Sequence, residues 1–529
     1  MDFFHSEAFT ARVRELMNQH HVPGVSIAVV QDDKTASAGY GYASLEPSKP
    51  CTADTLFDIA SSSKSLTAAA VGLLVEDDEK YPEVQYEATV SGLLPEDFVL
   101  SKQEYTDSVT IDDILSHRTG MPLHCYAFMG PKAAHPDDAL SVTRSLRNMP
   151  IAYPIRSRYI YSDIGYIVAT HLIEVKTGQN FPDFLEERFF QPLGMDSTSL
   201  QPTAARAKGF GDRIAPGYLW DKKHSTYREI TGPDCPEGQG AGSIITSAND
   251  CIKWVKALMR HEGPVSDKVY HDLVRLRSFC QNGGRMSKPY RSPDFYAAGL
   301  EVYYYRGYEV VGHDGAIPGF RSRFFWVPKI KFGGVILGNS DGAFSFGNIL
   351  TLQLIDAAIG ILRAEPPVIK SDVPLRPQSQ VQDSVIQSPK AIDEKEEESD
   401  GSDEDEDEEQ AALVAMVDTA QAQVTPLNAY TGRYWHPGYH TIVVEVKDEK
   451  LFVDATDRSL EFTLHFDHVS DQTKYIAHMY DPYYEDWVFH LKAEFEFEED
   501  RAVRLGLDFE ESLKELIWFE REKTSSRDA

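Results

Sequence analysis

Phe57-Asp58-Ile59-Ala60-Ser61-Ser62-Ser63-Lys64 is the stretch of this 529-residue chain on which its interpretation depends. A short apolar, strand-like segment ends here, and an alanine-rich helical pattern continues to about Glu76. Ser61 therefore lies where a helix begins, with its hydroxyl and backbone N–H near the positive end of that helix. Lys64 follows almost one helical turn later, so the two side chains share a face.

A lysine in this position has a chemical use. When it is desolvated among other donors it can lose its proton and activate the neighbouring hydroxyl, which makes Ser61 a candidate nucleophile. The Ser-x-x-Lys pattern alone is weak evidence, because about one or two copies are expected by chance in a chain this long. The alternative is a polar helix start with no catalytic role.

Two further polar motifs follow at wider spacing. Tyr161-Ser162-Asp163 lies at the start of an apolar helical segment, and His313-Asp314-Gly315 follows the strand-like Val310-Val311-Gly312. Each has a structural alternative, namely a helix cap beside a buried tyrosine and a strand end with a turn glycine. Strand-like segments at residues 25–43 and 299–337 enclose a mainly helical region, which predicts an α+β fold.

In this order and at these spacings, the three motifs resemble the serine β-lactamase and penicillin-binding-protein superfamily. The similar branch is that of class C β-lactamases, carboxylesterases and D-aminopeptidases. Connecting segments at residues 111–122, 240–250 and 313–339 are similar as well, so the resemblance covers about residues 8–360. It implies a β-lactamase/transpeptidase-like α+β domain in which an antiparallel sheet is flanked by helices.

The resemblance also implies a role for each motif residue. Ser61 would attack a carbonyl and form an acyl-enzyme, and Lys64 would accept or relay the serine proton. Tyr161 would act as the phenolic base and later as the acid for the leaving group. Backbone N–H groups of Ser61 and Ala316 would form the oxyanion hole. His313 would orient the phenol or bind substrate, where many relatives carry lysine.

Two positions depart from the family pattern, and with Gly315 they are the expected substrate-binding residues. Asp163 replaces an asparagine whose amide donates to the substrate, and an ionised carboxylate only accepts. It would either pair with Lys64 or receive a cationic amine of the substrate. Asp314 belongs to a His-Asp-Gly motif where relatives have Lys-Thr-Gly, so a permanent cation for a substrate carboxylate is absent. Esters and amides, including peptides with D-residues, are therefore expected rather than antibiotics or cell-wall peptides.

The chain divides into three parts. Residues 1–365 form the expected hydrolase domain. Residues 366–425 are expected to be a disordered linker, because they contain the acidic block Asp393–Glu409 and no aromatic residue. Residues 426–523 alternate in short strand-like runs, which predicts a small antiparallel β-barrel. This barrel is similar to the lipocalin-like module of some relatives. Stabilisation, oligomerisation and gating of the substrate are its alternative roles.

Composition limits the partners and the compartment. Lys and Arg number 52 against 83 Asp and Glu, giving a net charge of -31, which disfavours nucleic acid and anionic membranes as partners. Five widely spaced cysteines without a Cys-x-x-Cys pair favour reduced thiols. We expect no secretory leader and no membrane span, hence a cytoplasmic protein. No metal or cofactor motif is present, and the expected partners are a small-molecule or peptide substrate, with a homo-oligomer left open.

The predicted function is that of a serine hydrolase that cleaves an ester or amide bond, which includes D-aminoacyl and peptide bonds, through an acyl-enzyme. An acyltransferase that moves an acyl group from a thioester to an alcohol is the first alternative, because the acyl-enzyme is common to both reactions. A non-catalytic scaffold of the same fold is the second.

Overall fold

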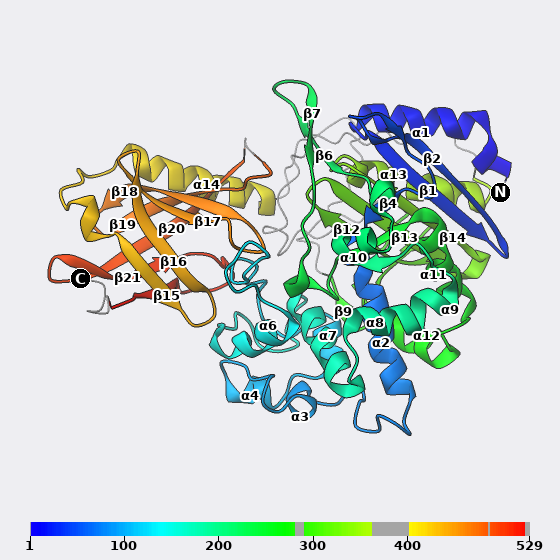
Figure 1. Ribbon diagram of the computed structural model, residues 1–529, viewed down its shortest axis with the longest axis horizontal. Helices are drawn as coiled ribbons and strands as arrows, with labels where there is room; N and C mark the ends of the chain where they lie inside the picture. Colours follow the sequence, from blue (N-terminus) through cyan, green and yellow to red (C-terminus); the bar gives the residue numbers. More distant parts are fainter. Residues whose placement is uncertain (1, 281–289, 362–400, 485–486, 524–529) are drawn as a thin grey trace.

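The chain folds into an α+β domain and a closed β-barrel that lie side by side (Figure 1). The computed structural model describes residues 2–280, 290–361, 401–484 and 487–523. A nine-stranded antiparallel sheet forms the centre of the first domain, in the order β3-β2-β1-β14-β13-β12-β11-β10-β9. Its strands are β1 (Gly24–Gln31), β2 (Lys34–Ser44), β3 (Lys49–Pro50), β9 (Ser278–Phe279), β10 (Phe295–Tyr296), β11 (Glu301–Tyr305), β12 (Tyr308–Ile317), β13 (Phe320–Val327) and β14 (Phe332–Gly338).

Strands from the two ends of the domain meet in the middle of this sheet. β1 pairs with β14, with Val25 opposite Gly338 and Gln31 opposite Phe332. Because β1 is apolar on both sides, Ile27 lies in the hydrophobic core on one face and Ala28 in the core on the other. The prediction of an α+β fold with a β-lactamase/transpeptidase-like sheet is confirmed.

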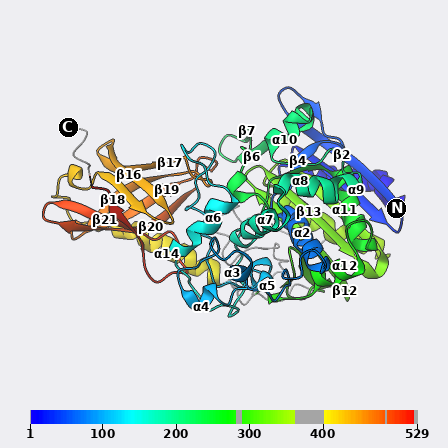
Figure 2. The same ribbon diagram turned by 60° about the horizontal axis from the view of Figure 1, so that its bottom comes forward.

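Helices cover both faces of the sheet (Figures 1 and 2). α1 (Glu7–Gln19) and α13 (Ala343–Ala358) pack on one face. The other face carries α2 (Lys64–Glu76), α11 (Ala248–Arg260) and α12 (Asp267–Val274), with α7 (Ile164–Thr177) packed against α2. The remaining helices are α3 (Val90–Leu93), α4 (Gln103–Thr106), α5 (Ile111–Leu115), α6 (Ala139–Ser145), α8 (Phe181–Leu185), α9 (Gln191–Leu193) and α10 (Pro202–Ala207).

Two small sheets complete the α+β domain. One joins β4 (Leu56–Asp58), β8 (Ile244–Ser247) and β5 (Ser199–Leu200), and the other is the hairpin of β6 (Gly217–Asp221) and β7 (Thr226–Ile230). β4 leads directly into the Ser-x-x-Lys segment, so this small sheet fixes the approach of the chain to the site.

Eight antiparallel strands close the C-terminal barrel. They are β15 (Gly432–His436), β16 (His440–Lys447), β17 (Lys450–Ala455), β18 (Phe462–Ser470), β19 (Lys474–Tyr480), β20 (Val488–Glu498), β21 (Arg501–Leu507) and β22 (Ile517–Arg521). Buried and partly buried residues alternate along most of β18, as expected for a strand with one face in the barrel interior. The antiparallel barrel is confirmed, and its likeness to lipocalins stays a prediction.

The segment predicted to be a disordered linker, residues 366–425, contains a described helix. Residues 366–400 lie outside the described residues, but residues 401–418 form α14 (Gly401–Asp418), which lies along the barrel (Figure 1). Leu413 packs with Val469 and Ile476 of the barrel. Sequence reasoning weighed the charge of the segment, whereas a few apolar residues at its end supply the contact that orders it.

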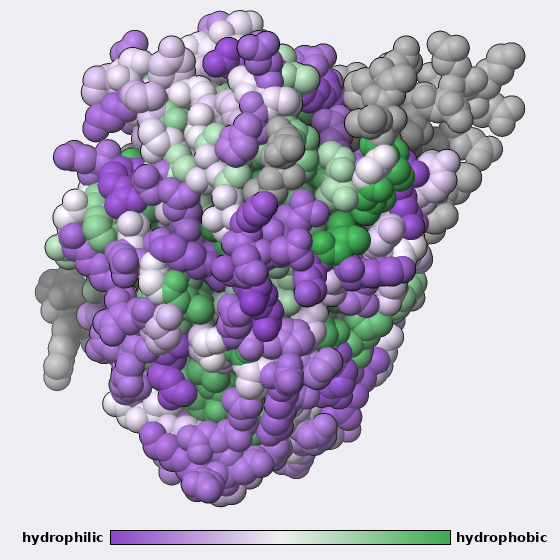
Figure 3. All heavy atoms as spheres, turned by 90° about the vertical axis from the view of Figure 1, so that its right-hand side faces the viewer, coloured by the Kyte–Doolittle hydropathy of each residue, from purple (hydrophilic) through white to green (hydrophobic). Residues whose placement is uncertain are grey.

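The barrel docks against an irregular segment of the α+β domain, residues 121–137. The ring of Tyr126 lies 5.3 Å from that of Phe462 and 5.5 Å from that of Phe509. Arg458 of the barrel is buried and pairs with Met129 in a β-bridge. The end of the molecule away from the barrel is mainly hydrophilic, with hydrophobic side chains in small groups (Figure 3).

No helix among the described residues is long and apolar enough to span a bilayer.

Candidate active site

Ser61 lies on a short 3₁₀-helix, Ala60–Ser63, between β4 and α2. Ala60 has a φ of +46°, an unusual value for a residue with a side chain. The backbone N–H of Ala60 donates a 2.7 Å hydrogen bond to Oδ1 of Asp58, which holds this conformation. Ser61 itself is 8% exposed, so the residue is largely buried but keeps some access to solvent. Strain held in place by neighbouring contacts is a common feature of functional sites.

Lys64 is fully buried and directed at Ser61. Its Nζ donates to Ser61 Oγ at 2.9 Å and to the carbonyl of Ala241 at 3.0 Å, and it lies 2.6 Å from Asp163 Oδ1. Burial lowers the pKa of Lys64, while the neighbouring Asp163 carboxylate raises it, and the lowering is larger. A buried lysine with a lowered pKa gives up its proton more readily than an exposed one.

Tyr161 completes the group around the nucleophile. Its hydroxyl interacts with the Ser61 side chain, and the Lys64 Nζ lies 4.8 Å from the centre of its ring. Burial and the Asp163 charge raise the pKa of Tyr161 well above its usual value, so the neutral phenol is favoured. A neutral phenol passes a proton on more easily than it acts as a free phenolate base.

His313 is connected to this group through Tyr296. Its Nδ1 bonds to the Asp314 carbonyl at 2.6 Å, so Nδ1 carries the hydrogen and Nε2 accepts a 2.8 Å hydrogen bond from the hydroxyl of Tyr296. Burial and the Lys64 charge lower the pKa of His313 to about 3. The imidazole is therefore neutral. Tyr296 packs with Tyr161 in one buried cluster, which links the histidine to the phenol.

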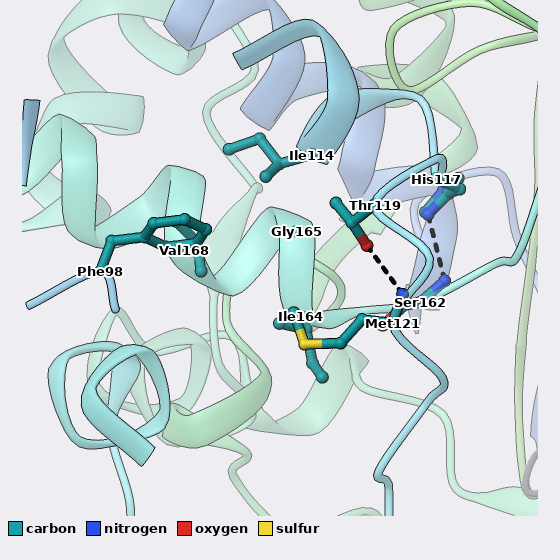
Figure 4. A pocket seen from close by; sticks show the side chains of 9 residues that line it. All are labelled: Phe98, Ile114, His117, Thr119, Met121, Ser162, Ile164, Gly165 and Val168. Atoms are coloured by element: carbon teal, nitrogen blue, oxygen red, sulfur yellow. Dashed lines mark hydrogen bonds between the residues drawn. The ribbon is translucent and has the colours of Figure 1, made fainter. Parts of the chain in front are cut away.

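His117 belongs to the site, although sequence reasoning gave it no role. Its Nδ1 accepts a 3.1 Å hydrogen bond from the backbone N–H of Ser162, and both residues line the same small cavity (Figure 4). Its ring lies 4.3 Å from that of Tyr161 and 4.5 Å from that of Tyr296. Burial lowers the pKa of His117 well below its usual value. The sequence of residues 111–122 resembles that of the family, but it does not indicate that His117 lies beside Tyr161 and Tyr296; the fold shows this.

The remaining predicted site residues are placed differently. The partly buried Asp314 carboxylate lies 2.6 Å from Arg323 Nε, so it is engaged in an ion pair. A Cβ on Gly315 would lie 2.0 Å from the Ile59 carbonyl, which explains the glycine by close packing. Ala316 is on β12, which packs against the 3₁₀-helix that carries Ser61. Substrate contacts by Asp314 and Gly315 stay predictions.

Serine, buried lysine and neutral phenol within one hydrogen-bonded group are suited to acyl transfer through a serine ester. Among the described residues no cluster of three or more His, Cys, Asp or Glu side chains is arranged to hold a metal ion. The fold and this site together define a serine hydrolase.

The chain belongs to the Beta-lactamase family, whose model matches residues 9–358. A second family model, described as a domain of unknown function (DUF3471), matches residues 418–521, which include the whole barrel. A relative from Aspergillus campestris, named unguisins hydrolase ungD′, is 34% identical over 87% of this chain and 82% of its own length.

Two further proteins are similar at lower sequence identity. A D-aminopeptidase from Brucella anthropi is 24% identical over 70% of this chain and 66% of its own length. The structure of an octameric penicillin-binding protein homologue from Pyrococcus abyssi aligns over 97% of this chain and 99% of that chain, with a TM-score of 0.56 and 19% identity. The relatives support a serine hydrolase acting on amide or ester bonds and do not favour the acyltransferase or scaffold alternatives.

Proposed function

We propose that this chain cleaves amide bonds of peptide-like compounds through an acyl-enzyme on Ser61. The observation that carries the proposal is the position of the buried Lys64 Nζ, 2.9 Å from Ser61 Oγ. The names of the relatives support the substrate class, since one is an unguisins hydrolase and another a D-aminopeptidase.

In the proposed reaction the neutral form of Lys64 removes the proton of Ser61 while Oγ attacks the substrate carbonyl. Backbone N–H groups of Ser61 and Ala316 receive the developing oxyanion. Tyr161 then passes a proton to the departing amine, and a water molecule hydrolyses the acyl-enzyme with the same groups in reverse order. His313 and Tyr296, both neutral, keep the phenol in place.

A substrate panel tests the proposed class. We expect the enzyme to release amine from D-aminoacyl anilides faster than from the L-enantiomers, and to hydrolyse an unguisin. Simple p-nitrophenyl esters should also react, because the same activated serine and oxyanion hole serve an ester carbonyl. Turnover of the esters together with complete inertness toward amides and the unguisin would contradict the amide proposal and favour an esterase.

Replacement of Asp163 by asparagine tests the Lys64 base. The Asp163 carboxylate raises the pKa of Lys64, so its removal lowers that pKa further. The rate rises with pH as Lys64 loses its proton, because the neutral amine is the base. We therefore expect the acidic limb of the pH profile of kcat/KM on a neutral ester to move to lower pH in Asp163→Asn.

The same variant distinguishes a second role. If Asp163 instead receives the ammonium group of the substrate, the asparagine variant loses aminoacyl anilides selectively through a raised KM, and the acidic limb on the neutral ester stays in place. A neutral ester and an aminoacyl anilide measured side by side separate the two roles. No change in either would leave Asp163 without a part in the reaction.

We also propose a reducing, cytoplasmic location and a homo-oligomeric state. The first is supported by the five cysteines, all of which are free thiols in the structure. The second is supported by the octameric relative from Pyrococcus abyssi. Light scattering of the purified chain measures the oligomeric state, and a monomer at micromolar concentration would contradict it.

A further inference from the structure

A tyrosine of the barrel domain forms a hydrogen bond with the α+β domain just after strand β14. Tyr484 follows β19, and its hydroxyl donates a 2.8 Å hydrogen bond to Oδ2 of Asp341. Asp341 lies just after β14 and is buried. Arg228 on β7 donates to the carbonyl of Tyr483, so the α+β domain holds the same barrel segment at two points.

Asp341 supports the tight turn between β12 and β13. Its Oδ1 accepts a 3.1 Å hydrogen bond from the backbone N–H of Gly319 and lies 2.9 Å from Arg321 Nη1. The same Nη1 donates to the carbonyls of Ile317, at 2.5 Å, and Phe320, at 2.7 Å. The Asp341 carboxylate thus holds the backbone of the turn at Gly319 and also the Arg321 guanidinium, which itself bonds to the turn.

The turn sets the position of Ala316. Across the hairpin Ala316 pairs with Arg321, and Ile317 pairs with Phe320 at the next step. Only two residues connect the strands, and one of them, Gly319, has a φ of +74°, which few other residues adopt. A movement of Arg321 or of the turn therefore displaces the backbone of Ala316 directly.

The barrel hydroxyl completes a buried ionic group. Arg321 and Asp341 are 7% and 6% exposed. A buried ion pair stabilises its surroundings only when its remaining hydrogen-bonding positions are also satisfied. Tyr484 satisfies Oδ2 of Asp341, whereas the contacts with Gly319 and Arg321 are made by Oδ1.

We propose that Tyr484 is a positioning residue of the active site. By holding Asp341 it keeps the β12–β13 turn, and with it the N–H of Ala316, in the geometry that receives the oxyanion. The inference rests on the proposed function, since it takes Ser61 as the nucleophile and Ala316 as the second donor. The barrel is then part of the catalytic unit, and not only a stabilising or oligomerising module.

Tyr484→Phe in the full chain tests this role, because it removes one hydroxyl and keeps the ring. We expect kcat/KM on a p-nitrophenyl ester to fall about tenfold, through kcat with KM unchanged, since oxyanion contacts act in the transition state. The rate of Ser61 labelling by a fluorophosphonate should fall by a similar factor. Tyr483→Phe is the matched control, because the hydroxyl of Tyr483 makes no hydrogen bond within the described residues.

Unchanged kcat and labelling rate in folded Tyr484→Phe would overturn the inference and leave the proposed function intact. If that variant is unstable, Asp341→Asn takes its place, because it keeps an acceptor for Gly319 and weakens the hold on Arg321. Asp341→Asn alone should then show the same loss in kcat and in labelling rate, and an unchanged rate would overturn the inference. Where both single variants fold, the double variant should be no slower than the slower one, because the residues act in series, and multiplied losses would overturn the inference. A wild-type enzyme that is not labelled at Ser61 would contradict the proposed function itself.

Discussion

Ser61→Ala should reduce kcat/KM by about a thousandfold or more while leaving the melting temperature nearly unchanged, as expected for deletion of a nucleophile. The variant loses one small hydroxyl, and Lys64 keeps its contacts with the Ala241 carbonyl and with Asp163. We therefore expect the Ser61→Ala variant to keep the native fold. Ester turnover, amide turnover and labelling by a fluorophosphonate should all disappear together, because each requires the Ser61 oxygen.

The adjacent serine supplies the matched control. The hydroxyl of Ser62 is hydrogen-bonded to that of Ser322 at 2.8 Å and is turned away from Lys64. Ser62→Ala should therefore keep fluorophosphonate labelling and lose less than about tenfold in kcat/KM. A folded Ser61→Ala enzyme with most of its activity, or one that is still labelled at the same rate, would place the nucleophile elsewhere.

Local pattern was sufficient for the long strands β1, β2 and β14 and for several helices, but α12 and α13 were not predicted. The apolar runs of β1 and β14 and the alanine-rich α2 follow from hydrophobic periodicity, which does not depend on distant parts of the chain. The order of α14 could not be found in this way. Its contact with the barrel involves Leu413 against Ile476, residues more than sixty positions apart, and nothing in the acidic segment itself indicates a partner surface.

In the active site, too, contacts between residues close in sequence could be predicted, and contacts between distant segments could not. Ser61 and Lys64 are three residues apart, so their approach follows from helix geometry alone. The roles of Tyr296 and His117 depend on packing between β10, α7 and the segment after α5, and no spacing in the sequence predicts it. Asp314 shows what a motif leaves out, and its predicted substrate contact stays a prediction. Its place in a motif suggested a substrate contact, whereas the buried Arg323 on the neighbouring strand holds its carboxylate.

The proton relay makes a second prediction with a large effect. Lys64→Met and Tyr161→Phe should each lower the acylation rate by roughly two orders of magnitude, because one removes the base and the other the hydroxyl that carries the proton onward. The double variant should be far less impaired than the product of the two losses. Lys64 donates a hydrogen bond to Ser61 and Tyr161 interacts with the same side chain, so loss of either one already interrupts the same transfer. Single-turnover release of p-nitrophenol measures acylation directly.

Tyr159→Phe is the control for the aromatic cluster. Its ring packs edge-on against His117 at 5.6 Å, but its hydroxyl faces Cys280 and not Ser61, so the variant changes the same cluster without touching the relay. We expect it to keep most of the acylation rate. Losses that multiply in the Lys64 and Tyr161 double variant would mean that the two residues act on separate steps. In that case Lys64 alone would serve as the base, and Tyr161 would act only on the leaving group.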